Sequence, residues 1–211
     1  MKEIPNTPSR ILTEGSILRA IFTLSWPVVA ANILQTVYNL TDAFWVGRLG
    51  EAAVAAVSFS FPILFLLISI GAGLSIAGTI LVAQYKGKGD TEKVGYISAQ
   101  TILMISAAAI VISIAGYIFT PKLIALTGAA PEVIPGAVSY LRVSFAGLLF
   151  LFSFFVFQSL LRGVGEVKLP MLIVLITVIL NFAADPIFIM GWGFIPPCGV
   201  AGAALATIIT E

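Results

Sequence analysis

The stretch "QTVYNLTDAFWV", residues 35–46, lies in a segment that otherwise has the composition of a membrane helix. From Ala20 to Gly47 the chain carries one charged side chain, Asp42, accompanied by three amides, Asn32, Gln35 and Asn39. A carboxylate in the hydrocarbon core of a bilayer is costly, and such residues usually face a helix-bundle interior or an ion pathway. The stretch therefore predicts a membrane-spanning helix that carries part of a functional site.

The composition places the whole chain in the bilayer. The protein has 211 residues, of which 59% are hydrophobic and 10% are charged, whereas soluble domains carry roughly 25% charged residues. The single cysteine, Cys198, excludes a disulfide within the chain, and the absence of histidine removes common zinc sites and the usual catalytic triads. We therefore expect no enzyme activity and no cofactor. The net charge of +1 gives no reason to expect a nucleic-acid partner.

Apolar runs of about 20 residues predict the membrane spans, and the predicted fold class is an all-α bundle of six transmembrane helices. A polar tail over residues 1–20 precedes the bundle of residues 21–211. The last span opens at Gly199 and runs for only about 13 residues, too short to cross a bilayer, so we expect a sixth helix truncated at its C-terminus. The first five spans are Ile21–Val46, Ala53–Ala83, Val94–Phe119, Ala137–Leu161 and Pro170–Met190.

The distribution of lysine and arginine predicts the orientation, because these residues favour cytoplasmic loops. Eight of the eleven basic residues fall on the side of the N-terminus, in the tail and in the loops 85–93 and 162–168. The opposite side is assigned only Arg48, Lys122 and Arg142. We therefore expect a multi-pass protein of the cell membrane with a cytoplasmic N-terminus.

Two polar stripes share one depth in the bilayer. Asn32, Gln35, Asn39 and Asp42 are spaced 3, 4 and 3 residues apart, and Thr177, Asn181 and Asp185 are spaced 4 and 4 apart, so each set follows one helical face. Asp42 precedes Arg48 by six residues and Asp185 precedes Gly191 by six, which puts each roughly 9 Å from the outer end of its span. We expect the two carboxylates to lie in one layer and to share a cation or a proton.

Several of these residues also have a structural interpretation. Amides and threonines in membrane helices commonly form hydrogen bonds between helices, which fits Asn32 and Thr177, and Tyr38 fits a packing aromatic. Proline removes a helix hydrogen bond and clashes with the preceding turn, so Pro27 and Pro186 are expected to bend their helices. Small-residue runs at 71–78 and 199–206 are expected to let helices pack closely.

The chain resembles the N-terminal half of the multidrug and toxic compound extrusion (MATE) transporters, closest to their prokaryotic DinF-like branch. Together with Pro27, five stretches carry the resemblance and run from one end of the chain to the other. They are "QTVYNLTDAFWVGRLG" (35–50), "GAGLSIAGTILVAQYKGKGD" (71–90), "QSLLRGVGEVKLPM" (158–171), "NFAADPIFIMGWG" (181–193) and "GVAGAALAT" (199–207).

The resemblance implies one lobe of a twelve-helix, two-lobe antiporter that exports organic cations or other amphipathic compounds against inward Na⁺ or H⁺. Its expected partners are the lipid bilayer, the substrate and a C-terminal lobe. The coupling cation, including Na⁺ as the metal, is then expected at Asp42, Asn181 and Asp185, with Thr207 completing the site. Gln35, Tyr38 and Asn39 are expected to line the lobe cavity.

Two other functions remain open at this point. A lipid-linked saccharide flippase of the same superfamily is expected to show several arginines or lysines facing the cavity, whereas none is expected in the middle of a span here. An ion-conducting membrane oligomer is expected to have polar residues through the full thickness of the bilayer, whereas those of this chain cluster towards one side.

Overall fold

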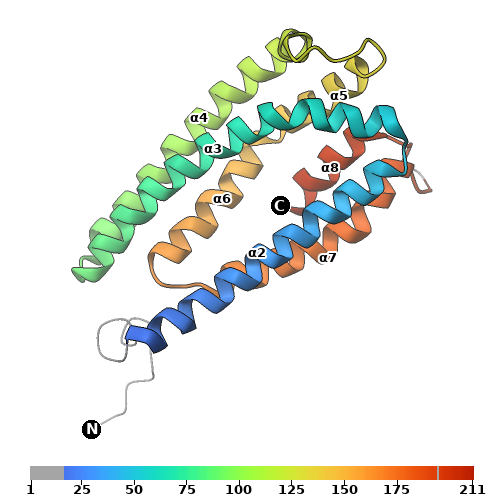
Figure 1. Ribbon diagram of the computed structural model, residues 1–211. Coiled ribbons are helices and arrows are strands. Elements are labelled where there is room, and N and C mark those ends of the chain that lie inside the picture. Colours follow the sequence, from blue (N-terminus) through green and yellow to red (C-terminus); the bar gives the residue numbers. More distant parts are fainter. Residues whose placement is uncertain (1–16, 194) are drawn as a thin grey trace.

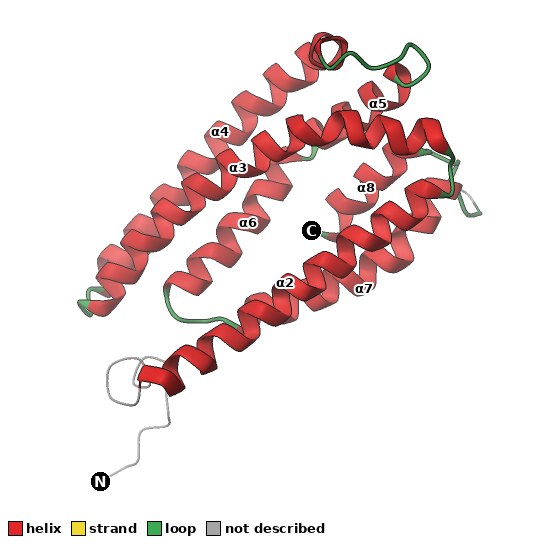
Figure 2. Cartoon of the chain, in the orientation of Figure 1, coloured by secondary structure: helices red, strands yellow, loops and turns green. Residues whose placement is uncertain are grey.

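The computed structural model describes residues 17–193 and 195–211, and the tail residues 1–16 of the predicted domain division lie outside the described part. Within that part the secondary structure is helical, apart from a bridge between Trp192 and Ile195 (Figure 2). The helices are α2 (Ile17–Gly47), α3 (Glu51–Gly87), α4 (Thr91–Leu126), α5 (Ile134–Ala146), α6 (Leu148–Gly163), α7 (Lys168–Met190) and α8 (Val200–Thr210).

The helices form two groups that meet at α8. Helix α2 packs along α7, while α3, α4 and α6 pack on one another on the other side of the lobe (Figure 1). Helix α8 packs against α7 and α5 and thereby joins the two groups, whereas α6 and α7 make little contact. Helices α2, α3, α4 and α7 are long and apolar enough to cross a membrane, and α5 with α6 adds a fifth span if the bent pair is counted as one.

The predicted fourth span is wrong as a single helix, because it breaks at Gly147 and bends by 53° between α5 and α6. A side chain at Gly147 would collide with Ile208, so the glycine lets α8 approach the break. The carbonyl of Phe145, next to the break, accepts a 2.6 Å hydrogen bond from the Ser113 hydroxyl of α4. The break therefore leaves that backbone group satisfied inside the bundle, as apolar surroundings require.

Arg142 belongs to the predicted fourth span, Ala137–Leu161, and is counted with the basic residues of the outer side. It lies within α5, and its guanidinium is 5.3 Å from the centre of the Tyr117 ring on α4. This cation–π contact and the flexible arginine stem allow the charge to be accommodated inside an apolar span. The charge faces α4 and not the aspartates.

Glycines admit the largest core side chains between α3, α4, α5 and α6. The ring of Phe152 lies against Gly71, and the ring of Phe145 lies against Gly116. Gly202 of α8 faces the backbone carbonyl of Phe188 on α7, where a side chain would collide with main-chain atoms. These contacts confirm that the small-residue runs at 71–78 and 199–206 bring helices close together.

The polar connection between α3 and α4 is fixed by a helix cap. The Asp90 carboxylate accepts a 3.0 Å hydrogen bond from the backbone N–H of Lys93 and lies 3.3 Å from its Nζ. The backbone hydrogen bond, followed by the lysine charge, holds the pKa of the exposed Asp90 carboxyl below its usual range. The loop thus starts α4 with an ionised N-cap, which favours a sharp helix start outside lipid.

Candidate functional site

The two aspartates of the polar stripes meet between α2 and α7. The Asn181 amide nitrogen of α7 donates to Asp185 Oδ1 at 2.9 Å and to Asp42 Oδ1 of α2 at 3.2 Å. Asn181 and Asp185 are four residues apart, so they lie on the same face of α7, which packs along α2. The structure agrees with the expectation that Asp42 and Asp185 share one layer.

The polar atoms of this site have fewer partners than their burial requires. Asn181 and Asp185 are fully buried, and Asp42 is half-buried. Asp185 Oδ2 and Asn181 Oδ1 are buried without a hydrogen-bond partner in the described structure. Neither aspartate forms an ion pair with a lysine or arginine of the described residues. Buried acceptor oxygens without donors are costly unless a cation or a proton satisfies them.

Apolar clusters flank the site on both sides along the α2–α7 pair. On one side, Tyr38 packs with Phe154, Val174 and Val178. On the other side, a second cluster contains Val46, Ala53, Ile189 and Ala203. The acidic layer therefore lies in a low-dielectric environment in which charge interactions are much stronger than in water.

Two tyrosines border the acidic layer. Tyr38 of α2 is 3% exposed, and its hydroxyl lies 3.3 Å from the Thr210 hydroxyl of α8. Tyr140 of α5 packs beside the cluster that contains Ile189 and interacts electrostatically with Asp42 and Asp185. The Tyr38 phenol, on the same helix as Asp42, and the Tyr140 phenol of α5 thus bring hydrogen-bonding oxygens to the edge of the site.

The remaining residues suggested by the sequence lie around this centre. Thr207 donates to the carbonyl of Ala203 at 3.1 Å and interacts with Tyr38, so it lies on the tyrosine side of the site. Thr177 bonds to its own helix, to the carbonyl of Val174 at 2.8 Å. On α2, Gln35 is half-buried, and Asn39 and Asn32 are exposed on the surface of the lobe.

The prolines leave their helices continuous. Helix α2 runs through Pro27 and α7 runs through Pro186, whereas the sharp bend of the described structure falls at Gly147. Bending at Pro27 and Pro186 therefore stays a prediction about movement of the lobe.

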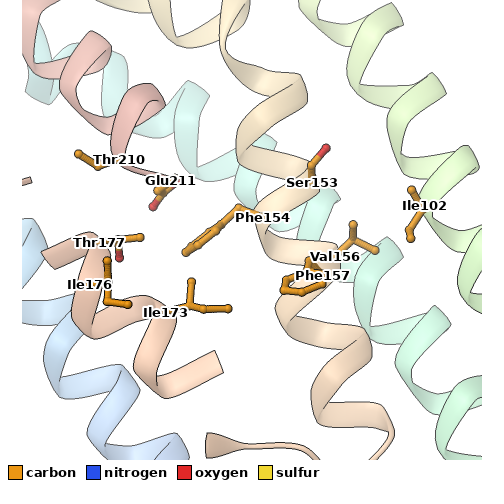
Figure 3. A pocket seen from close by; sticks show the side chains of 10 residues that line it. All are labelled: Ile102, Ser153, Phe154, Val156, Phe157, Ile173, Ile176, Thr177, Thr210 and Glu211. Atoms are coloured by element: carbon orange, nitrogen blue, oxygen red, sulfur yellow. The ribbon is translucent and has the colours of Figure 1, made fainter. Parts of the chain in front are cut away.

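A pocket of about 610 Å³ lies where the two helix groups separate, beside the end of α8 (Figure 3). Phe154 projects from α6 towards Glu211, and Ile173 and Thr177 of α7 line the opposite wall. The Oε2 atom of Glu211 is buried without a hydrogen-bond partner. The remaining lining residues are Ile102, Ser153, Val156, Phe157, Ile176 and Thr210.

A family model described as MatE matches residues 27–187, which include most of α2, all of α3 to α6 and α7 as far as the acidic layer. The chain belongs to the MatE family. The match confirms the resemblance to MATE transporters, and the helical bundle fits one lobe of a two-lobe transporter. This chain is accordingly a multi-pass membrane protein.

Curated relatives and solved structures agree with this assignment. The MatE chain is 34% identical over 199 residues to the probable multidrug resistance protein YoeA of Bacillus subtilis, covering 94% of this chain and 43% of YoeA. It is 32% identical to the probable multidrug resistance protein YpnP of the same organism, with 94% and 44% covered. A solved MOP superfamily transporter from Pyrococcus furiosus superposes with a TM-score of 0.88 at 32% identity, with 97% and 44% covered. The chain thus spans less than half the length of these relatives.

The donor set of this MatE lobe suits a monovalent cation or a proton. It offers carboxylate and amide oxygens, which are hard ligands, and the orphaned Asp185 Oδ2 and Asn181 Oδ1 have free lone pairs. Within the described residues no group of three or more acidic or cysteine side chains is arranged around one metal ion. Asp42, Asn181 and Asp185 therefore fit one bound positive charge that relieves the repulsion between two carboxylates.

Sequence reasoning overlooked two residues near the site. Tyrosine in an apolar segment commonly marks the membrane interface, so the sequence offered no reason to place Tyr140 at the site. Its approach to the site depends on the bend between α5 and α6 at Gly147. Glu211 stands at the end of the sequence, where it offers no helical spacing from which burial could be inferred. The sequence signal for Glu211 was an acidic residue directly after an apolar run.

Proposed function

We propose that this lobe is the N-terminal half of a cation-coupled antiporter that exports organic cations or other amphipathic compounds. The observation that carries the proposal is the group of Asp42, Asn181 and Asp185, in which two carboxylates accept from one amide nitrogen. The buried oxygens Asp185 Oδ2 and Asn181 Oδ1 have no hydrogen-bond partner. The family and the names of its relatives support a transporter, while the coupling ion and the substrate belong to this proposal.

The chemistry of the site follows from charge balance. The two carboxylate groups repel each other in a dehydrated layer, and a bound Na⁺ or a proton removes that repulsion. Asp42, Asp185 and the Asn181 amide oxygen would hold the cation, with Thr207 as a further oxygen in a rearranged site. Since Asp42 lies on α2 and the other two on α7, occupancy favours the close approach of these helices, and loss of the cation favours their separation.

Export requires a second lobe in this proposal. Alternating access in transporters of this kind uses two bundles that rock around a central site, and residues 21–211 supply one of them. We propose that α8 is the outer part of a sixth span, that Gln35, Tyr38 and Asn39 face the path of the substrate, and that the N-terminus lies in the cytoplasm of a cell-membrane protein.

The alternatives are less well supported. A flippase for lipid-linked saccharides is expected to present several basic residues to the cavity, but Arg142, a basic residue within α5, stacks on Tyr117. An ion-conducting oligomer is expected to carry a polar path through the bilayer, but apolar clusters flank the acidic layer on both sides.

Efflux from proteoliposomes tests the proposal. A transporter that contains this lobe and its second lobe is reconstituted with a fluorescent organic cation, and an inward Na⁺ gradient and an inward H⁺ gradient are imposed separately. We expect at least one gradient to drive efflux, and its collapse with an ionophore to stop it. Equal movement of the dye with and without both gradients would contradict cation-coupled export.

A further inference from the structure

We infer that Arg142 of α5, stacked on Tyr117 of α4, binds the phosphate group of a phospholipid at the surface between these two helices. The ligand is the headgroup phosphate of one lipid molecule, held by charge-assisted hydrogen bonds from the guanidinium. The site is separate from the aspartates of α2 and α7. The proposed function enters only in naming the leaflet, which is the outer one in the proposed orientation.

Arg142 lacks a carboxylate partner within the described part of the lobe. Its Nε is buried without a hydrogen-bond partner, and no described acidic residue forms an ion pair with its guanidinium. The Tyr117 ring, whose centre lies 5.3 Å from Cζ, attracts the positive charge, but a ring face offers no oxygen acceptor to the five N–H groups. Because a guanidinium stays charged in proteins, the group is costly in an apolar span until an acceptor reaches it.

The guanidinium lies at a surface that lipid covers. Tyr117 is 47% exposed, and its neighbours on α4, Ile114 and Ile118, are exposed as well. Arg142 is half-buried, so part of its side chain is accessible beside the tyrosine. Exposed apolar side chains on a helix that crosses a membrane contact lipid. An acceptor that reaches Arg142 from this surface therefore belongs to a lipid molecule.

The depth of Arg142 suits the phosphate level of the bilayer. Lys93 and Lys122 are exposed, and they bound a part of α4 that carries no charged residue. This part is roughly 44 Å long, which matches a bilayer with its headgroups. Tyr117 precedes Lys122 by five residues, or roughly 7.5 Å. A long basic side chain at that depth can extend its charge to the headgroups.

The chemistry of arginine favours a phosphate over other lipid groups. Its planar fork of N–H donors fits two phosphate oxygens at once, whereas a lysine ammonium acts as a point charge. Stacking on the Tyr117 ring orients the guanidinium plane. Lys122 offers a matched comparison, because its Nζ lies 5.8 Å from the centre of the Phe119 ring, near the same end of α4, but is exposed.

Native mass spectrometry of the purified 211-residue chain tests the inference. The chain is released from detergent micelles that contain phosphatidylglycerol, and the affinity for the first bound lipid is measured. Diacylglycerol with the same acyl chains is the probe without phosphate, and inorganic phosphate is added as a competitor. The variants are Arg142→Gln, Arg142→Lys and the control Lys122→Gln, each checked for folding by thermal unfolding. Since the experiment uses neither an ion gradient nor an exported substrate, its outcome is distinguishable from failure of the proposed function.

We expect Arg142→Gln to weaken phosphatidylglycerol binding about tenfold or more, because it removes the charged donors. Arg142→Lys should weaken it several-fold, since the charge stays but the paired donors are lost, and this variant decides the test if Arg142→Gln does not fold. Lys122→Gln should change the affinity by less than about twofold. Wild-type affinity in the Arg142 variant that decides the test would overturn the inference. Diacylglycerol bound as tightly as phosphatidylglycerol, or displacement of the lipid by inorganic phosphate, would also overturn it.

Discussion

Replacing Asp185 by asparagine should stabilise the cation-free lobe at alkaline pH. The Asn181 amide nitrogen lies 2.9 Å from Asp185 Oδ1 and 3.2 Å from Asp42 Oδ1. The two carboxylate oxygens are therefore at most about 6 Å apart. At an effective dielectric constant of about 20, two negative charges at that distance repel by about 3 kcal/mol. Asp185→Asn removes one charge while keeping a side chain that can accept from Asn181.

The same substitution should remove the response to cations. Neutralising one of two carboxylates about 4 Å from a bound Na⁺ costs about 4 kcal/mol of attraction, or roughly a thousandfold in affinity. Thermal unfolding in nanodiscs, followed by tryptophan fluorescence, measures both effects. The wild type should gain several degrees on addition of Na⁺ or on acidification, and Asp185→Asn should start higher and gain little.

The control is Glu51→Gln, which makes the same change of charge at an exposed position in the first turn of α3. It should respond to cations or acid as the wild type does. If Asp185→Asn were less stable than the wild type at alkaline pH, and the wild type were indifferent to both Na⁺ and acid, the two aspartates would be a structural hydrogen-bonded pair and the reasoning would fail.

Two further predictions concern orientation and packing. With Cys198 replaced by serine, a cysteine at exposed Lys88 should be protected from an impermeant thiol reagent in intact cells, and one at exposed Glu132 should be labelled; the reverse pattern would invert the topology. Gly202→Ala should lower the free energy of unfolding by about 1–3 kcal/mol, because the new methyl group meets the backbone of Phe188. Gly73→Ala, with open space around it, should be neutral or slightly stabilising, and equal losses in both variants would show that the close approach of α7 and α8 is unimportant.

The sequence predicted the features that depend on periodicity and hydropathy. Five apolar runs marked the spans, and the matched depths of Asp42 and Asp185 predicted that they would meet, since charge in lipid must find a polar environment. The position of Asn181 one turn before Asp185 followed from the same spacing. Each of these inferences needs only the residue spacing within single helices and the thickness of the bilayer.

The features that it missed depend on contacts between helices. The break at Gly147 is contacted by Ser113 of α4 and Ile208 of α8, neither of which is near it in sequence. The stripe on α2 also divides in a way that spacing alone does not reveal: Asp42 turns inwards, whereas Asn39 is exposed. Which edge of a polar stripe faces the bundle is set by the packing of α2 on α7.

The central claim is that the buried carboxylates couple export to a cation, and gradient-driven efflux in aspartate variants tests it most directly. Asp42→Asn and Asp185→Asn are made in the transporter that contains this lobe, with insertion and thermal stability measured beside Glu51→Gln. We predict that both aspartate variants remain folded and lose ion-driven efflux of a fluorescent organic cation, while Glu51→Gln exports like the wild type. Wild-type efflux in both aspartate variants would contradict the account.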